Sequence, residues 1–252
     1  MNLLTRQLLV CLGTAHVLGD FVLRPGREAQ DARKLWVVLQ RALTVAALSY
    51  LFCGAWGSWL IPTGVFLGHT VVDAATVRLR RRDAASFLLE QSAYAAVLIV
   101  IAVAAALRGA SSYWVSLFGA VYLKVLIVVM GAVFSVLAGG VLIGRAVQPL
   151  LDEMNRGADG NEAASQGDRG LEHGGRLIGR LERALILLFV LSGQPASVGF
   201  LVAAKSIFRF GELKERHQRM EAEYIIIGTM MSFGFGLLIA YVTEFLLGLA
   251  WT

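Results

Sequence analysis

The amino-acid sequence predicts an all-α bundle of membrane-spanning helices. Of its 252 residues, 57% are hydrophobic and only 16% are charged, whereas a soluble domain typically carries ~25% charged residues. Several apolar runs reach the ~20 residues that a helix needs to cross the hydrocarbon layer of a lipid bilayer. We therefore expect a polytopic bundle of six to eight membrane segments, with the bilayer as the surroundings of its apolar surface.

The apolar runs give the expected helices in chain order. Runs of ordinary span length occur at residues 7–23, 35–53, 59–77 and 84–107. The next run starts at Tyr113 and continues to about residue 147. Because this run is too long for one straight span, we expect Gly139 and Gly140 to break or tilt it. The remaining apolar runs are 177–191, 195–210 and 224–251.

The two short runs form a hairpin around Pro195, and the sequence leaves its topology open. Each run is near or below the ~17-residue lower limit for a span. Two full crossings would give eight membrane segments in total. A re-entrant hairpin near 177–210, buried in protein, would give six.

Polarity divides the chain into three expected parts. Residues 1–148 form an N-terminal membrane domain, and residues 177–252 form the C-terminal hairpin and the last span. The segment between them, 149–176, is rich in Gly, Asn, Ser and charged residues and cannot bury a core. We expect this segment to be a flexible cytoplasmic loop.

The basic residues predict an orientation. If residues 24–34 are cytoplasmic, all but four of the 23 Lys and Arg fall in cytoplasmic segments or the short hairpin runs. Lys and Arg collect on the cytoplasmic side of a membrane, so we expect both termini on the opposite side. The same bias accounts for the net charge of +5, and no nucleic-acid partner is expected.

Two matching His-x-x-x-Asp pairs carry the candidate chemistry. His16 and Asp20 are four residues apart, as are His69 and Asp73, and this spacing puts both side chains on one helix face. The two helices run in the same direction, so each pair reaches the cytoplasmic end of its span. Glu90, two turns into the next helix, reaches the same depth. We expect these five groups to share one layer of the membrane, with the two pairs converging on one cavity and Glu90 at its edge.

These groups have three interpretations. Ionisable side chains inside a bilayer cost several kcal/mol unless they are paired or hydrated. As a first interpretation, His16, Asp20, His69 and Asp73 bind a divalent metal, and Asp20, Asp73 and Glu90 are catalytic groups that use metal-activated water. The second is a proton or ion pathway through the same groups. The third is hydrogen bonding that only holds the helices together.

The C-terminal hairpin holds a second polar cluster. Arg183, Lys205 and Arg209 are candidates to bind an anionic group such as a lipid phosphate. The alternative is a salt-bridge network inside the membrane, in which Glu182 or Glu223 pairs with these cations.

The sequence resembles an uncharacterised family of bacterial membrane proteins, catalogued as domain of unknown function 3307. The residues that match its pattern are His16, Asp20, Phe21, Lys34, His69, Asp73, Arg78 and Gln91. The chain departs from the pattern at Arg24, Glu90 and Tyr94, where Gln, Asp and His are usual, and near Arg41, where a His is usual. The resemblance supports the fold, the site residues and a place in the bacterial inner membrane, and it implies no established activity.

The leading functional hypothesis is a metal-dependent hydrolase that acts on a membrane-embedded or anionic lipid-like substrate. The rival hypotheses are a proton- or ion-coupled transporter and a non-catalytic membrane partner of a cytoplasmic protein. The chain contains no nucleotide-binding glycine loop, no HExxH and no GxSxG motif, so ATPase, zincin and serine-hydrolase functions have no support.

Overall fold

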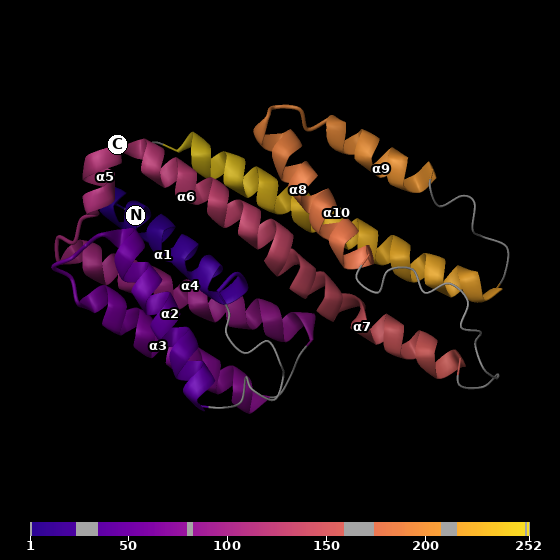
Figure 1. The fold of residues 1–252 in the computed structure, drawn as a ribbon, viewed down its shortest axis with the longest axis horizontal. Helices are drawn as coiled ribbons and strands as arrows, with labels where there is room; N and C mark the ends of the chain where they lie inside the picture. Colours follow the sequence, from indigo (N-terminus) through magenta and orange to yellow (C-terminus); the bar gives the residue numbers. More distant parts are fainter. Residues whose placement is uncertain are drawn as a thin grey trace. The chain divides into compact units, whose positions relative to one another are not determined.

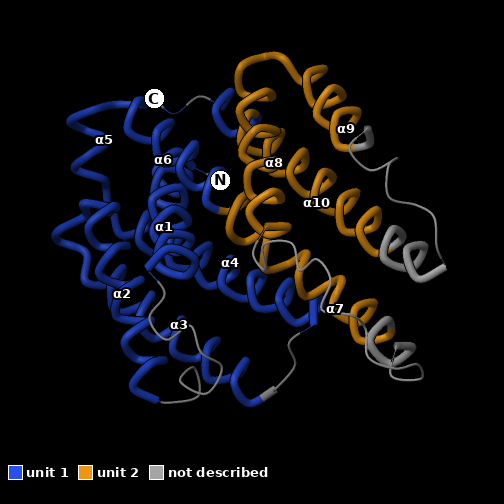
Figure 2. Tube along the Cα trace, turned by 45° about the vertical axis from the view of Figure 1, so that its right-hand side comes forward, with its two compact units in different colours: residues 1–133, 245–252 blue, residues 134–244 orange. Residues whose placement is uncertain are grey.

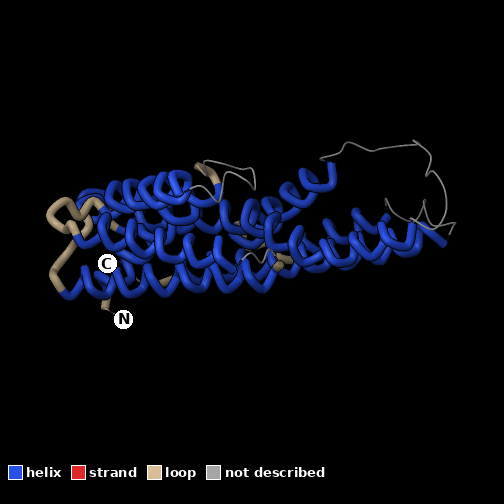
Figure 3. The backbone as a smooth tube through the Cα atoms, turned by 90° about the horizontal axis from the view of Figure 1, so that it is seen from below, coloured by secondary structure: helices blue, strands red, loops and turns tan. Residues whose placement is uncertain are grey.

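The computed structural model describes residues 2–23, 35–79, 83–158, 174–207, 216–249 and 251. Within these ranges the chain consists of helices joined by turns and contains no strand, which confirms the all-α prediction (Figures 1 and 3). The chain forms two compact units (Figure 2), Met1–Val133 with Phe245–Thr252 and Phe134–Glu244. These limits follow from packing, whereas the limits expected near residues 148 and 177 followed from polarity alone.

Five helical stretches of the described chain are long and apolar enough to cross a membrane: Leu35–Cys53, Leu60–Arg78, Ala84–Leu107, Ala120–Glu153 and Tyr224–Gly248. They agree with the multi-pass membrane character that the composition predicts. The first helix is not among the five, since Arg6, His16 and Asp20 reduce its apolar content. The count of six to eight membrane segments, the cytoplasmic orientation of the loops and the bacterial inner membrane stay predictions.

The first unit contains most of the N-terminal half of the chain. Two of its helices coincide with the predicted runs 35–53 and 84–107. The predicted fifth run is divided at Gly119, whose φ of 60° ends one helix before the next begins. The helices are α1 (Leu3–Phe21), α2 (Leu35–Cys53), α3 (Leu60–Leu79), α4 (Ala84–Leu107), α5 (Tyr113–Phe118) and α6 (Ala120–Val133).

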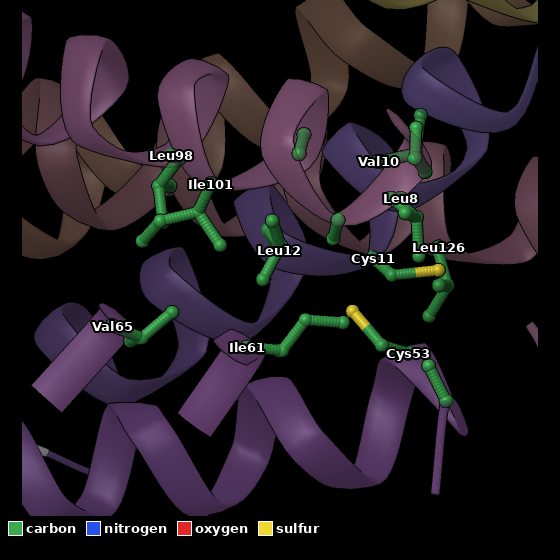
Figure 4. Packing of buried hydrophobic residues seen from close by; sticks show 14 of the residues in the cluster. Leu8, Val10, Cys11, Leu12, Cys53, Ile61, Val65, Leu98, Ile101 and Leu126 are labelled. Carbon is green, nitrogen blue, oxygen red and sulfur yellow. The ribbon is translucent and has the colours of Figure 1, made fainter. Parts of the chain in front are cut away.

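Helix α1 lies at the centre of the first unit, where it packs against α2, α4 and α6, and α3 packs against α2 and α4. The apolar core between these helices includes Leu12, Ile61, Leu98 and Leu126 (Figure 4). The helices are thus held together over one face each, while many apolar side chains on the other faces stay exposed, such as Val71 at 67%. Exposed apolar faces on long helices suit contact with lipid.

Glycines let neighbouring helices pack closely in this unit. A Cβ atom on Gly19 would lie 2.6 Å from Cγ2 of Val45, so the backbone of α1 lies against the side chain of Val45 on α2. Gly68 meets Val97 equally closely between α3 and α4. Small residues permit such backbone contact between membrane helices. Each of these glycines directly precedes a candidate site residue, Asp20 or His69.

The second unit begins with one turn of π-helix, η2 (Phe134–Ala138), directly before Gly139. The sequence predicted an interruption at Gly139 and Gly140, and this turn lies beside it. The other helices of the unit are α7 (Gly139–Ala158), α8 (Gly174–Leu191), α9 (Ser197–Ile207) and α10 (Arg216–Gly248), the last of which belongs to this unit as far as Glu244.

The loop expected over 149–176 is shorter at both ends in the structure. Helix α7 continues to Ala158, and α8 begins at Gly174; residues 159–173 lie outside the described residues. Polar side chains extend α7 because they bond along the helix surface, as Gln148 does to Asp152 at 3.0 Å. Polarity placed the start of the expected loop too early, and a loop over 159–173 stays a prediction.

Candidate functional site

The two His-x-x-x-Asp pairs converge inside the first unit. His16 and Asp20 lie in the C-terminal half of α1, and His69 and Asp73 lie in the C-terminal half of α3. All four side chains are buried, and the centroids of the two histidine rings are 5.1 Å apart. The prediction that the two pairs meet is confirmed.

Arg41 of α2 links the two aspartates. Its Nη2 donates to Oδ1 of Asp20 at 3.2 Å, and its Nη1 lies 3.9 Å from Oδ1 of Asp73. The guanidinium is itself buried, with 7% of the residue exposed. A planar guanidinium presents donors to two acceptors at once, so one arginine joins three helices through a pair of carboxylates.

Tyr94 of α4 completes the packing of the site. Its hydroxyl donates to Oδ1 of Asp73 at 2.5 Å. Its ring stacks on His69, with centroids 4.5 Å apart and planes at 20°, and lies 4.8 Å from the ring of His16. Asp73 is therefore held by an ion pair with α2 and a hydrogen bond from α4. We call His16, Asp20, Arg41, His69, Asp73, Gln91 and Tyr94 the polar cluster.

Three buried atoms of the polar cluster have no hydrogen-bond partner among the described residues. Nε2 of His16 lies 3.3 Å from Oε1 of Gln91, but Nδ1 of His16, Nε2 of His69 and Nε2 of Gln91 are unpartnered. Most buried polar atoms are hydrogen-bonded, and an unpaired one is costly. The cluster can therefore bind a further polar atom or a proton.

Glu90 lies at the edge of this arrangement. It precedes Gln91 on α4 by one residue and Tyr94 by one turn, and its side chain is half-buried. Arg41 donates a hydrogen bond to Asp20, and Tyr94 donates one to Asp73. The catalytic roles of Asp20, Asp73 and Glu90 stay predictions.

The geometry gives no support to a metal site. In the part of the chain that the structure describes, no three His, Cys, Asp or Glu side chains are arranged to hold a metal ion. The guanidinium of Arg41 occupies the position of a shared cation between Asp20 and Asp73. The ligand set expected for a divalent metal does not fit this arrangement, and we assign no chemistry to such a metal.

The sequence pattern did not point to Arg41 or Tyr94 as site residues, although both lie at or near positions where the family pattern usually has His. A second signal for Arg41 was available, because a charge near the start of an apolar run is costly in a bilayer unless it is paired. The second signal for Tyr94 was weaker. It lies one turn after Glu90, and tyrosine is common in membrane helices without a special role.

The second unit holds the C-terminal polar residues. Nζ of Lys205 pairs with Glu182, at 2.7 Å from Oε1 and 2.9 Å from Oε2, which confirms the predicted pairing between these acidic and basic residues. Arg209 and the side chain of Glu223 lie outside the described residues. The binding of an anionic group by Arg183, Lys205 and Arg209 stays a prediction.

Arg183 makes a different set of contacts. Its Nε donates to the carbonyl oxygen of Ser135 at 2.8 Å, and its Nη2 donates to that of Val136 at 3.0 Å. Its Nη1 donates to the hydroxyl of Ser232 at 2.7 Å. Ser135 and Val136 belong to the π-helix η2, in which the regular pattern of backbone hydrogen bonds is broken. Arg183 therefore provides hydrogen-bond donors to backbone carbonyl oxygens of this irregular turn.

Comparison with known proteins relates the first unit to a family. The family described as Protein of unknown function (DUF3307) matches residues 8–134, a segment that contains the whole polar cluster and ends beside the limit of the first unit at Val133. No curated protein and no solved structure matches the chain. Because the matched segment covers half of the chain, and its His-x-x-x-Asp pairs are those that the sequence pattern singled out, the chain belongs to the DUF3307 family of proteins of unknown function.

Proposed function

We propose that this protein is a multi-pass membrane carrier that takes up and releases one positive charge, a proton or a small monovalent cation, at the polar cluster. One observation carries the proposal: a single buried guanidinium, that of Arg41, is shared by two buried carboxylates. The two carboxylates thus compete for one cation.

The contacts of the cluster support exchange of a single cation. Arg41 lies within ion-pair distance of both Asp20 and Asp73, and a carboxylate can take up a proton or pair with another cation. Uptake of one positive charge at Asp20 or Asp73 would weaken the hold of that carboxylate on Arg41, and its release would restore the first arrangement. Two states of similar free energy are what a carrier requires.

The histidines give the cluster a place for that charge. His16 and His69 are buried next to the aspartates, and each has one ring nitrogen without a hydrogen-bond partner among the described residues. Histidine exchanges protons near neutral pH more readily than other side chains. A proton could thus be held by a ring nitrogen or by a carboxylate, and the stacked ring of Tyr94 keeps the histidines in contact.

The hydrolase hypothesis finds less support than the carrier. A metal-dependent hydrolase needs a ligand set with an open position for water, and Arg41 lies where a metal would bind the two carboxylates. Lipid hydrolysis and docking of a cytoplasmic protein stay sequence-based hypotheses that no described contact favours.

Ion flux in reconstituted vesicles tests the proposal. We expect purified protein in vesicles with an internal pH-sensitive dye to move protons when a membrane potential is imposed, or to move Na⁺ or K⁺ in parallel assays. Asp73→Asn should reduce this flux at least about tenfold, because it removes the negative charge that attracts the cation. Asp83→Asn is the matched control, since Asp83 is an exposed helix cap whose role Asn can keep.

Two outcomes would contradict the carrier. One is a folded wild-type protein that moves none of the three cations above the rate of empty vesicles. The other is unchanged flux in both Asp20→Asn and Asp73→Asn, which would reduce the polar cluster to a structural role.

A further inference from the structure

One end of the first unit collects aromatic side chains, which we call the aromatic patch. Its members lie at the end of α2, in the turn between α2 and α3, and on α5: Tyr50, Trp56, Trp59, Tyr113, Trp114 and Phe118. The rings contact one another in a chain. Tyr50 stacks on Trp59 at 5.9 Å and meets the edge of Trp56 at 5.2 Å, and Trp56 meets Trp114 at 6.2 Å.

The aromatic patch is anchored on its inner side and open on its outer side. The indole of Trp114 donates to the carbonyl oxygen of Leu51 at 2.7 Å, in the last turn of α2, where carbonyls lack partners within the helix. The hydroxyl of Tyr50 donates to the carbonyl oxygen of Trp56 at 2.6 Å. By contrast, Trp59 is 71% exposed and Trp56 is 45% exposed. Fixed rings therefore face outward.

The turns that carry the patch hold little charge. Residues 54–59 and 109–119 contain no Asp, Glu, Lys or Arg, and the exposed Arg108, which caps the end of α4, is the one charged residue that adjoins them in the chain. At the other ends of α3 and α4, Arg78 and Asp83 are both exposed. Exposed Trp36 lies at that same end, on the first turn of α2 (72% exposed).

The distance between the two groups of tryptophans matches a bilayer. Helix α2 has 19 residues and is therefore about 28 Å long, close to the ~30 Å thickness of the hydrocarbon layer. Trp36 lies at its start, and the aromatic patch lies at its end. Apolar side chains of the intervening helix surfaces are exposed, among them Leu43 of α2 and Leu67 of α3, at 61% and 62%.

We propose that the aromatic patch is the surface by which the first unit contacts the interfacial layer of a lipid bilayer, with Trp36 in the opposite interface. Tryptophan and tyrosine favour this layer because each has an apolar ring and a polar N–H or O–H group. The assignment places the polar cluster in the membrane, since Arg41 follows Trp36 by five residues, or about 8 Å along α2. The cluster then lies inside the hydrocarbon layer, near the interface that Trp36 occupies.

Quenching by brominated lipids tests the assignment without reference to any activity. The protein is reconstituted in phosphatidylcholine vesicles whose acyl chains carry bromine either near the headgroup or near the chain end. Wild-type fluorescence is compared with that of Trp59→Phe, Trp36→Phe and Trp251→Phe, so that each difference reports one indole. Both Trp59 and Trp36 are highly exposed, so their replacement should leave the fold intact.

We expect the Trp59 and Trp36 contributions to be quenched about twofold more strongly by bromine near the headgroup than by bromine near the chain end. Trp251, which is 3% exposed, should respond weakly to both. Stronger quenching of Trp59 by the deep bromine would contradict the assignment. Protection of Trp59 from both lipids and from aqueous iodide would also overturn it, because a protein would then cover the patch.

Discussion

Arg41 and Arg183 are both buried arginines, one in each unit, and they differ in what they contact. The guanidinium of Arg41 faces the carboxylates of Asp20 and Asp73. The guanidinium of Arg183 instead donates to two backbone carbonyls and the hydroxyl of Ser232. Their exposed fractions, 7% and 3%, are similar, so burial alone does not separate their roles.

The difference shows that the chemical groups that contact a buried arginine distinguish a candidate functional site from a structural contact. Carbonyl and hydroxyl groups keep the same charge at any ordinary pH, so the contacts of Arg183 hold η2 in one conformation. Carboxylates can gain or lose a proton, so the contacts of Arg41 can change with the state of Asp20 or Asp73. The proposed exchange of a cation therefore belongs to the polar cluster, and Arg183 supports the fold of the second unit.

Replacing Arg183 should have the largest effect on stability. Arg183→Met removes three charge-assisted hydrogen bonds and leaves the carbonyls of Ser135 and Val136 without this donor. We expect the free energy of unfolding in detergent micelles to fall by about 3–5 kcal/mol. Arg183→Lys should recover part of the loss, because an ammonium can reach some of the same acceptors. If Arg183→Met unfolds like the wild type, the arginine does not support the π-helix.

Replacing Gly19, which directly precedes Asp20 of the polar cluster, should have the next largest effect on the free energy of unfolding. In Gly19→Ala the new methyl group would lie 2.6 Å from Cγ2 of Val45, so the valine side chain or the two helices must shift next to the ion pair of Asp20 and Arg41. We expect a loss of about 1–3 kcal/mol in unfolding free energy, together with reduced flux. Gly144→Ala is the control, because a Cβ there meets nothing within 4 Å. Equal stability of the two variants would show that the close approach is unimportant.

Removing the hydroxyl of Tyr94 should have the smallest of these effects. Tyr94→Phe keeps the ring against His69 and His16 and deletes only the bond to Asp73. We expect a loss of about 1–2 kcal/mol in unfolding free energy and a change in the pH dependence of flux. A variant with wild-type stability and an unaltered pH profile would remove Tyr94 from the site.

The sequence predicted the helices well where charge or glycine bounded an apolar run. Helix α4 lies between Asp83, which caps its start, and Arg108, and its predicted limits are those observed. The convergence of the two His-x-x-x-Asp pairs was also predictable. Both helices run in the same direction, and in each the His and the Asp lie four residues apart on one helix face. The pairing of Glu182 with Lys205 followed from the cost of lone charges in a membrane.

Other features depend on packing that one sequence does not encode locally. Arg41 reaches both aspartates only because of how α2 is rotated against α1 and α3, and no spacing rule specifies that rotation. The division at Gly119 requires a positive φ, which glycine permits but does not require. The π-turn before Gly139 depends on a donor 48 residues away in the chain, Arg183.

Proton counting tests the central claim most directly. Wild-type protein, Asp73→Asn and Asp83→Asn are shifted between alkaline and acidic pH in weakly buffered detergent, and the protons taken up per molecule are measured. If the polar cluster exchanges one proton, the wild type should take up about one more proton than Asp73→Asn over the pH range in which flux appears. Since Asp83 is an exposed helix cap outside the polar cluster, its variant should take up as many protons as the wild type over that range. Equal uptake by the wild type and Asp73→Asn across the range of flux, with no competing uptake of Na⁺ or K⁺, would contradict the account.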